Sequence, residues 1–202
     1  VTAPAITGTR LGLILVSGAL PELLDDTVIR TVTTPWGSVD VHELADPAGV
    51  VALRRHHPVA GGPYVPAHLV DHHRNVAALC AAGCDRVLTV ASVGSLRRWP
   101  VGTFVVPFDV YAPQVNPTFH DGALGHRVPS FDEPWRDAVV ATWEDAAAHP
   151  AMDGGVYAQT TGPRFETPAE VRALAAHADI VGMTGMPEAS LAREMETPYA
   201  AI

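Results

Sequence analysis

The sequence predicts a single α/β domain in which a mixed central β-sheet is flanked by helices on both faces. Three observations lead to this prediction. Short apolar runs that suit buried strands alternate along the chain with longer segments of helical periodicity. Glycine, proline and small polar residues stand where these runs end, as they do at turns and helix ends. No internal repeat or low-complexity tract divides the 202 residues, which suffice for one domain with a proper core. Because strands and helices alternate, we expect about seven strands in the sheet.

Composition and charge exclude several classes of protein. Hydrophobic residues make up 48% of the chain and charged residues 17%, which is typical of a globular protein and not of a disordered one. The net charge is −9 and the 13 Lys and Arg residues are scattered without a basic stripe, so we expect no nucleic-acid partner. The longest apolar runs are too short to span a bilayer, and the N-terminus shows no signal-peptide pattern. We therefore expect a cytoplasmic protein that has no membrane partner.

The first strand is expected at residues 10–16, an apolar run that ends at Ser17 and Gly18. A hydroxyl followed by glycine amides after a strand is a plausible corner for binding phosphate. A plain turn explains the same two residues.

A turn between strands is predicted at residues 34–37 (TPWG), and residues 50–53 (VVAL) form the next strand. That strand leads into residues 54–57 (RRHH), which form either a solvated basic strand end or an anion site. Residues 58–66 then form a loop rich in glycine and proline.

The middle of the chain continues the alternation. Residues 70–82 read as a helix that stops at Gly83, and residues 86–91 read as a central strand. The small residues of segment 92–96 follow that strand, and residues 104–107 form one more strand. Four prolines make segment 111–134 irregular. A helix is expected at residues 135–148.

Neither the cysteines nor the histidines predict a metal site. Cys80 and Cys84 flank Gly83 without neighbouring ligands, so a disulfide framework or a zinc site is not expected. His68 and His72 have the spacing of a helical metal pair, but no carboxylate motif accompanies them. We expect no metal and no cofactor.

The most informative stretch begins with a strand at residues 156–159. It is followed by segment 162–167 (GPRFET) and by a helix whose start is well marked. Thr167 is a candidate N-cap, Pro168 suits the first helical position, and Glu170 completes a capping box.

A second strand at residues 180–181 runs into segment 182–188 (GMTGMPE), and a helix continues to residue 194. Open α/β sheets bind ligands beyond the carboxyl ends of their strands. Phe165, Glu166 and Met183 stand at these two strand ends and are therefore candidate ligand contacts. Each of them taken alone is as well explained as a core or surface residue.

The motifs GPRFETPAEVR and ADIVGMTGMPEA, followed by LARE, closely resemble the trimeric branch of the nucleoside phosphorylase family. That branch includes purine nucleoside phosphorylases and methylthioadenosine or methylthioinosine phosphorylases. The resemblance implies the fold of this family and the phosphorolysis of a purine nucleoside to a free purine and a sugar 1-phosphate. It further implies a homotrimer and inorganic phosphate as the co-substrate, with no cofactor.

The resemblance also implies roles for particular residues. Arg55 is the best phosphate candidate, because a guanidinium fork binds phosphate through two hydrogen bonds. His56 or His57 would be a second donor. The family has glycines where this chain has Leu15 and Val16, which departs from the usual phosphate corner. The implied phosphate contacts are Ser17, Gly18, Arg55, His56, His57, Ser92 and Thr184; the sugar contacts are Val93 and Met183; and the purine contacts are Phe165, Glu166 and Gly94.

Glu166 carries the expected base preference. In the family a glutamate at this position accompanies 6-oxopurines, because a carboxylate accepts a hydrogen bond from their N1–H. Family members continue past the last strand with an Asn or Asp that holds the purine, and then with a helix. We therefore expect residues 1–202 to be a phosphorylase-like domain that lacks this C-terminal segment, and we assign no catalytic residue up to Ile202.

Three other functions remain open at this point. The chain could act on nucleosides with a modified 5′ position, as methylthioadenosine and methylthioinosine phosphorylases do. A related hydrolase would use water in place of phosphate, although Arg55 and Thr184 favour phosphate. A protein that binds purine and phosphate without catalysis is the third possibility, prompted by Leu15 and Val16.

Overall fold

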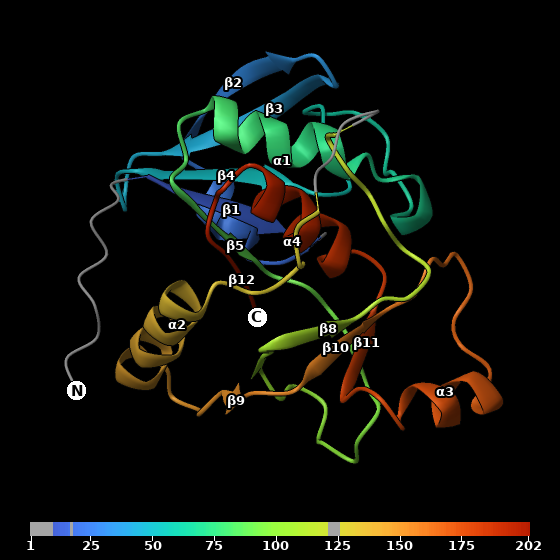
Figure 1. The fold of residues 1–202 in the computed structure, drawn as a ribbon. Helices are drawn as coiled ribbons and strands as arrows, with labels where there is room; N and C mark the ends of the chain where they lie inside the picture. The colour runs from blue at the N-terminus through green and yellow to red at the C-terminus, as the bar shows by residue number, and fades with distance from the viewer. Residues whose placement is uncertain (1–9, 17, 121–125) are drawn as a thin grey trace.

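The computed structural model describes residues 10–16, 18–120 and 126–202, and its centre is a mixed sheet of six strands (Figure 1). The strand order is β12-β5-β1-β4-β3-β2. The four strands β12, β5, β1 and β4 run parallel, whereas β3 pairs antiparallel with both β4 and β2. The strands are β1 (Leu11–Leu15), β2 (Thr27–Thr34), β3 (Gly37–Leu44), β4 (Val50–Arg54), β5 (Arg86–Thr89) and β12 (Tyr199–Ala201).

A second, smaller sheet of four strands lies beside the first, in the order β6-β11-β10-β8. A further pair of short strands, β7 and β9, is separate from both. The mixed central sheet is confirmed, but the strands do not form one sheet of seven. Pro107 and the glycines Gly154 and Gly155, both with positive φ, interrupt the chain around these short strands. The strands are β6 (Gly94–Ser95), β7 (Val105–Val106), β8 (Asp109–Tyr111), β9 (Met152–Asp153), β10 (Val156–Gln159) and β11 (Ile180–Gly182).

The helices begin where side chains cap them. The Thr167–Glu170 capping box is present at the start of α3, as the sequence predicts. Helix α2 starts two residues before the predicted position, because Asp132 accepts a hydrogen bond from the Trp135 amide at 3.0 Å. The helices are α1 (His72–Ala81), α2 (Glu133–Ala146), α3 (Pro168–Leu174) and α4 (Gly185–Glu194), with short 3₁₀ turns η1 (Pro21–Leu24) and η2 (Ala67–Leu69).

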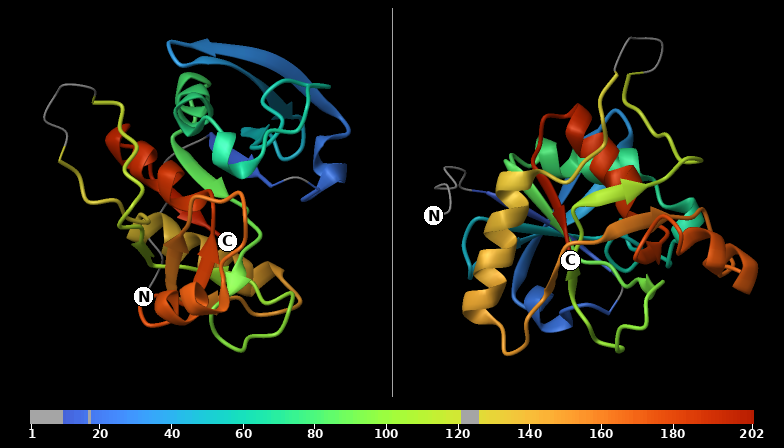
Figure 2. Two further views of the ribbon diagram at one scale, coloured as in Figure 1. Left: turned by 90° about the vertical axis from the view of Figure 1, so that its right-hand side faces the viewer. Right: turned by 60° about the horizontal axis from the view of Figure 1, so that its bottom comes forward.

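Helices cover both faces of the central sheet (Figures 1 and 2). Successive side chains of a strand point to opposite faces, and β12 shows which helices lie on each. Tyr199 and Ala201 belong to the large core that includes residues of α1 and α4. Ala200, between them, packs in a separate cluster with Val139 of α2. Helices α1 and α4 therefore lie on one face and α2 on the other.

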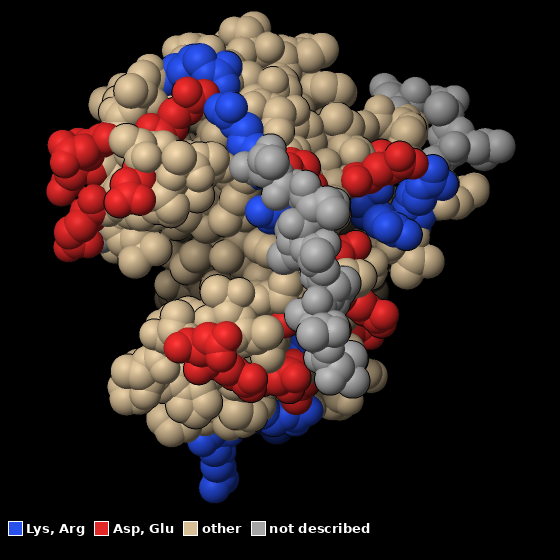
Figure 3. All heavy atoms as spheres, turned by 90° about the vertical axis from the view of Figure 1, so that its left-hand side faces the viewer, with Lys and Arg blue, Asp and Glu red and all other residues tan. Residues whose placement is uncertain are grey.

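The face drawn in Figure 3 carries its charged groups in small clusters rather than in one continuous area. On the face drawn in Figure 3, blue basic side chains appear in separate groups, several of them beside acidic ones. Glu43, for example, accepts ion pairs from both Arg10 and Arg30. None of the described helices combines the length and the apolar character that crossing a bilayer requires.

Candidate active site

A cavity of about 360 Å³ opens beyond the carboxyl ends of strands from both larger sheets. Strands β1, β4 and β5 are parallel and in register, so the residues that follow them emerge at one edge. The residues after β10 and β11 close the cavity from the second sheet. Nine residues singled out in the sequence line it: Arg55, His56, Ser92, Val93, Gly94, Phe165, Glu166, Met183 and Thr184.

Two other candidates lie outside the lining of this cavity. His57 lies outside its lining, although it is adjacent to His56. Gly18 is exposed and also lies outside the lining. Ser17 falls outside the described residues.

Several lining residues had no role in the sequence analysis. Val16 supplies an apolar wall at the place where the family resemblance implies glycine, while Leu15 turns into the core and is only 1% exposed. Tyr64, from the loop after β4, and Thr160, after β10, also line the cavity. The glycine- and proline-rich loop pointed to a flexible connection but gave no sign that its tyrosine reaches the site.

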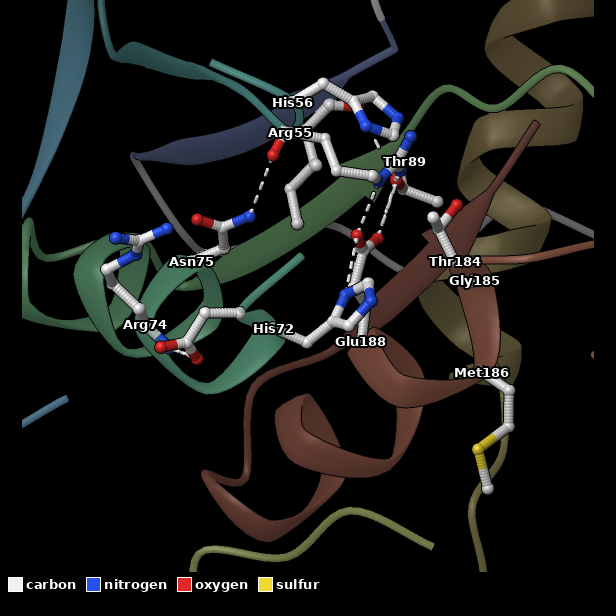
Figure 4. A network of polar contacts seen from close by, with 12 residues as sticks. Arg55, His56, His72, Arg74, Asn75, Thr89, Thr184, Gly185, Met186 and Glu188 are labelled. Carbon is white, nitrogen blue, oxygen red and sulfur yellow. Dashed lines mark hydrogen bonds and ion pairs between the residues drawn. The ribbon is translucent and has the colours of Figure 1, made fainter. Parts of the chain in front are cut away.

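Arg55 is held by a buried network (Figure 4). Its Nε donates to Glu188 Oε1 at 2.6 Å, and its Nη2 donates to Glu188 Oε2 at 3.2 Å. Nη2 also donates to the Thr89 hydroxyl, and Nη1 donates to the Val90 carbonyl at 3.2 Å. The guanidinium edge that was expected to bind phosphate, formed by Nε and Nη2, thus binds Glu188. Since a guanidinium has five N–H groups, one on Nη1 has no partner among the described residues, although the side chain is 0% exposed.

Glu188 is the buried partner of Arg55 that the sequence analysis missed. It is 0% exposed and also accepts hydrogen bonds from Tyr199 at 3.0 Å and from Thr89 at 2.9 Å. Nδ1 of His72 lies 3.5 Å from its Oε1. Burial alone would raise the pKa of Glu188, but the Arg55 charge and the hydrogen bonds outweigh it and lower this pKa to about 2. One feature of the sequence could have revealed this role. Glu188 stands among small and apolar residues of its helix, and a carboxylate buried in such surroundings requires a partner.

Thr184 stands at the N-terminus of α4 but does not cap it. The Tyr157 hydroxyl accepts from the Thr184 amide at 3.3 Å and from the Gly185 amide at 3.1 Å. Gln159 Oε1 accepts from the Met186 amide at 3.1 Å. The first amides of α4 are therefore occupied by side chains of β10. Within the described residues, the Thr184 hydroxyl has no hydrogen-bond partner and remains able to bind a ligand.

His56 is fixed by two contacts. Its Nδ1 lies 2.7 Å from the Val65 carbonyl oxygen, and its ring stacks on Tyr64 with centroids 5.0 Å apart. Burial lowers the pKa of His56, and the neighbouring Arg55 charge lowers it further against the opposing effect of the Val65 hydrogen bond. His57 instead meets the edge of Tyr64, with centroids 5.7 Å apart.

The loop before α3 presents Phe165 and Glu166 at the open side of the cavity. Phe165 is 85% exposed. The loop is anchored by Arg164, which pairs with Glu170 at 2.7 Å, and Glu170 in turn accepts from the Thr167 amide. The Arg164 hydrogen bond lowers the pKa of Glu170 to about 2. The aromatic and carboxylate side chains are thus held at the mouth of the site without being buried.

Cys80 and Cys84 are free cysteines, and burial raises the pKa of each thiol. Among the described residues, no group of three or more His, Cys, Asp or Glu side chains is placed to hold a metal ion.

Comparison with known proteins identifies similar chains. The model of the Phosphorylase superfamily matches residues 11–202. The chain is 38% identical to a probable S-methyl-5′-thioinosine phosphorylase of Methanosarcina acetivorans, over 88% of this chain and 69% of that protein. It is 33% identical to a probable 6-oxopurine nucleoside phosphorylase of Archaeoglobus fulgidus, over 90% of this chain and 74% of that protein.

Solved structures show the same fold. Methylthioadenosine phosphorylase from Schistosoma mansoni superposes with a TM-score of 0.81 at 28% sequence identity. The match covers 96% of this chain and 78% of that one.

Proposed function

This chain belongs to the phosphorylase superfamily, and we propose that it catalyses the phosphorolysis of purine nucleosides, with 6-oxopurine bases preferred. The observation that carries this proposal is the cavity into which nine candidate residues converge from separate strand ends. Relatives named 6-oxopurine nucleoside phosphorylase and S-methyl-5′-thioinosine phosphorylase support it, since thioinosine carries a 6-oxopurine base.

Phosphate is the nucleophile in this reaction. A phosphate oxygen forms a bond to C1′ of the sugar while the bond from C1′ to the purine nitrogen breaks. The electron pair of that bond leaves with the purine, which takes up a proton. Because no protein nucleophile takes part, catalysis consists of positioning the reactants and stabilising charge.

The inner end of the cavity suits phosphate. Arg55 lines the cavity with its guanidinium buried against Glu188 and one N–H uncommitted, and the Thr184 hydroxyl is available as a donor. His56 and the backbone amide of Ser92 complete the proposed anion contacts. Glu188 does not touch phosphate in this proposal and instead holds Arg55 in place.

The outer part of the cavity suits the nucleoside. Met183 and Val93 would pack against the sugar, and Phe165 would stack on the purine beside Gly94. Glu166 would accept a hydrogen bond from N1–H of a 6-oxopurine. Adenine has a lone pair at N1, which an ionised carboxylate repels, so adenine nucleosides are expected to be poorer substrates.

We further propose that inorganic phosphate is the only co-substrate and that no metal or other cofactor takes part. The enzyme would act in the cytoplasm as a homotrimer. A second candidate substrate class is 5′-methylthioinosine, which the names of several relatives favour.

The test is to measure release of the free base from inosine, guanosine, adenosine and 5′-methylthioinosine, each with and without phosphate. We expect phosphate-dependent release and a sugar 1-phosphate product, with inosine or its 5′-methylthio form favoured over adenosine. Base release without phosphate would identify a hydrolase. Binding of phosphate and purine without turnover would identify a protein that has no catalytic activity.

A further inference from the structure

The hydrogen bond of His56 fixes which of its ring nitrogens carries a proton. Its Nδ1 lies 2.7 Å from the Val65 carbonyl oxygen. A carbonyl oxygen can only accept a hydrogen bond, so Nδ1 must carry the proton that is donated. In the neutral imidazole, Nε2 is then an acceptor, and His56 lines the cavity.

The surroundings of His56 favour the neutral imidazole. Burial lowers its pKa from the ordinary value of 6.5, and the Arg55 charge and His57 act in the same direction. The Val65 hydrogen bond and Glu188 oppose them, and the Glu188 carboxylate is already paired with Arg55. Tyr64 stacks on the ring.

We infer that His56 selects for an oxyanion that itself carries a proton, because Nε2 offers the bound anion an acceptor and not a donor. This inference rests on the proposed function, in which His56 lies against phosphate. Inorganic phosphate and arsenate retain at least one proton at pH 8 and can donate it to Nε2. Sulfate retains none, so a sulfate oxygen would face the Nε2 lone pair.

Phosphate and sulfate form a matched pair for this test. Both are tetrahedral anions of similar size, and at pH 8 both carry a charge close to −2. A difference in affinity at this pH therefore reports the proton and not the charge. One lone pair set against another in a buried site weakens binding roughly tenfold to a hundredfold.

The experiment is isothermal titration of the whole chain with phosphate, arsenate and sulfate at pH 8. We expect phosphate and arsenate to bind at least tenfold more tightly than sulfate, in line with the penalty for an unmatched polar pair. In the variant His56→Gln, the side-chain amide can donate as well as accept, so sulfate should gain affinity and the preference should fall to about threefold or less. The adjacent His57→Gln is the control, and it should retain the full preference because His57 lies outside the cavity lining.

Three outcomes would overturn the inference. Sulfate binding as tightly as phosphate in the unchanged protein, or an undiminished preference in His56→Gln, rejects the role of His56 and leaves phosphorolysis standing. Absence of binding by all three anions rejects the anion site itself, and the proposed function with it.

Discussion

The guanidinium of Arg55 and the carboxylate of Glu188 form an ion pair in which both side chains are fully buried, with Nε and Oε1 2.6 Å apart. The two residues are 133 positions apart in the sequence. Their contact joins the end of β4 to helix α4, and therefore holds together two of the segments that line the cavity.

The first prediction concerns the stability that this pair confers. Replacing Glu188 by Gln leaves the Arg55 charge buried without its counter-ion, so the free energy of unfolding should fall by about 3 kcal/mol. Urea denaturation followed by circular dichroism measures this quantity. Glu43→Gln is the control, because the ion pairs of Glu43 are partly exposed and should contribute less than about 1 kcal/mol. Equal, small effects of the two substitutions would contradict the prediction.

The second prediction concerns pH. The pKa of Glu188 is lowered to about 2 in the folded protein, whereas an unfolded glutamate titrates near its usual value of about 4.3. The unfolded chain thus binds this proton first as pH falls, so the stability due to Glu188 is present above about pH 4.3 and is lost between there and about pH 2. Urea unfolding at pH 7, 5, 4 and 3 should show a shallower loss of stability in Glu188→Gln than in the unchanged protein. Parallel curves would show that Glu188 does not titrate in this range.

The third prediction concerns Thr184. Its hydroxyl is not needed by helix α4, whose first amides are bound by Tyr157 and Gln159. Thr184→Ala should therefore raise the KM for phosphate about tenfold or more, through loss of a hydrogen bond to a charged ligand, and leave the melting temperature nearly unchanged. Thr184→Ser keeps the hydroxyl and should restore the phosphate KM. A large fall in melting temperature with an unaltered KM would show that the hydroxyl is structural.

The fourth prediction concerns base preference. Glu166→Gln replaces an acceptor by an amide that can also donate to the N1 lone pair of adenine. The ratio of kcat/KM for inosine to that for adenosine should fall about tenfold, since an unmatched polar pair costs about 1–3 kcal/mol. Glu144→Gln, at an exposed position of α2, is the matched control. A preference for adenosine in the unchanged protein would remove the role given to Glu166.

The fifth prediction is a homotrimer. Large apolar side chains remain exposed on the single chain: Phe165 is 85% exposed, Phe108 55% and Val128 79%. Contact with neighbouring subunits would cover apolar surface of this kind. Light scattering coupled to size-exclusion chromatography should give three times the mass of the chain, and a stable monomer at working concentration would refute the prediction.

Local features of the fold were predictable from the sequence. Strand β10 occupies the predicted residues 156–159, and the capping box that starts α3 is formed by Thr167 and Glu170 as expected. Both depend on interactions between residues close in sequence, which a pattern of side chains displays directly. The start of α2 was placed two residues late because the capping role of Asp132 was not recognised.

Long-range pairing was not predictable in the same way. Arg55 is recognisable in the sequence as a cation suited to phosphate. Nothing near it in the sequence indicates that Glu188 accepts hydrogen bonds from its Nε and Nη2. The role of Tyr157 is likewise invisible, because its hydroxyl reaches amides 27 and 28 residues away. Such partners are set by the packing of sheets and helices and not by any local pattern. The division of the strands into three sheets was missed for the same reason.

The two ends of the cavity differ in how firmly they are built into the protein. Arg55 and Thr184 lie within the core, whereas Phe165 and Glu166 stand on a loop near the surface. A substitution at position 166 therefore disturbs no buried partner, while one at position 55 disturbs a whole network. With the proposed roles, a change of base preference at position 166 would leave the buried network proposed to hold the anion intact.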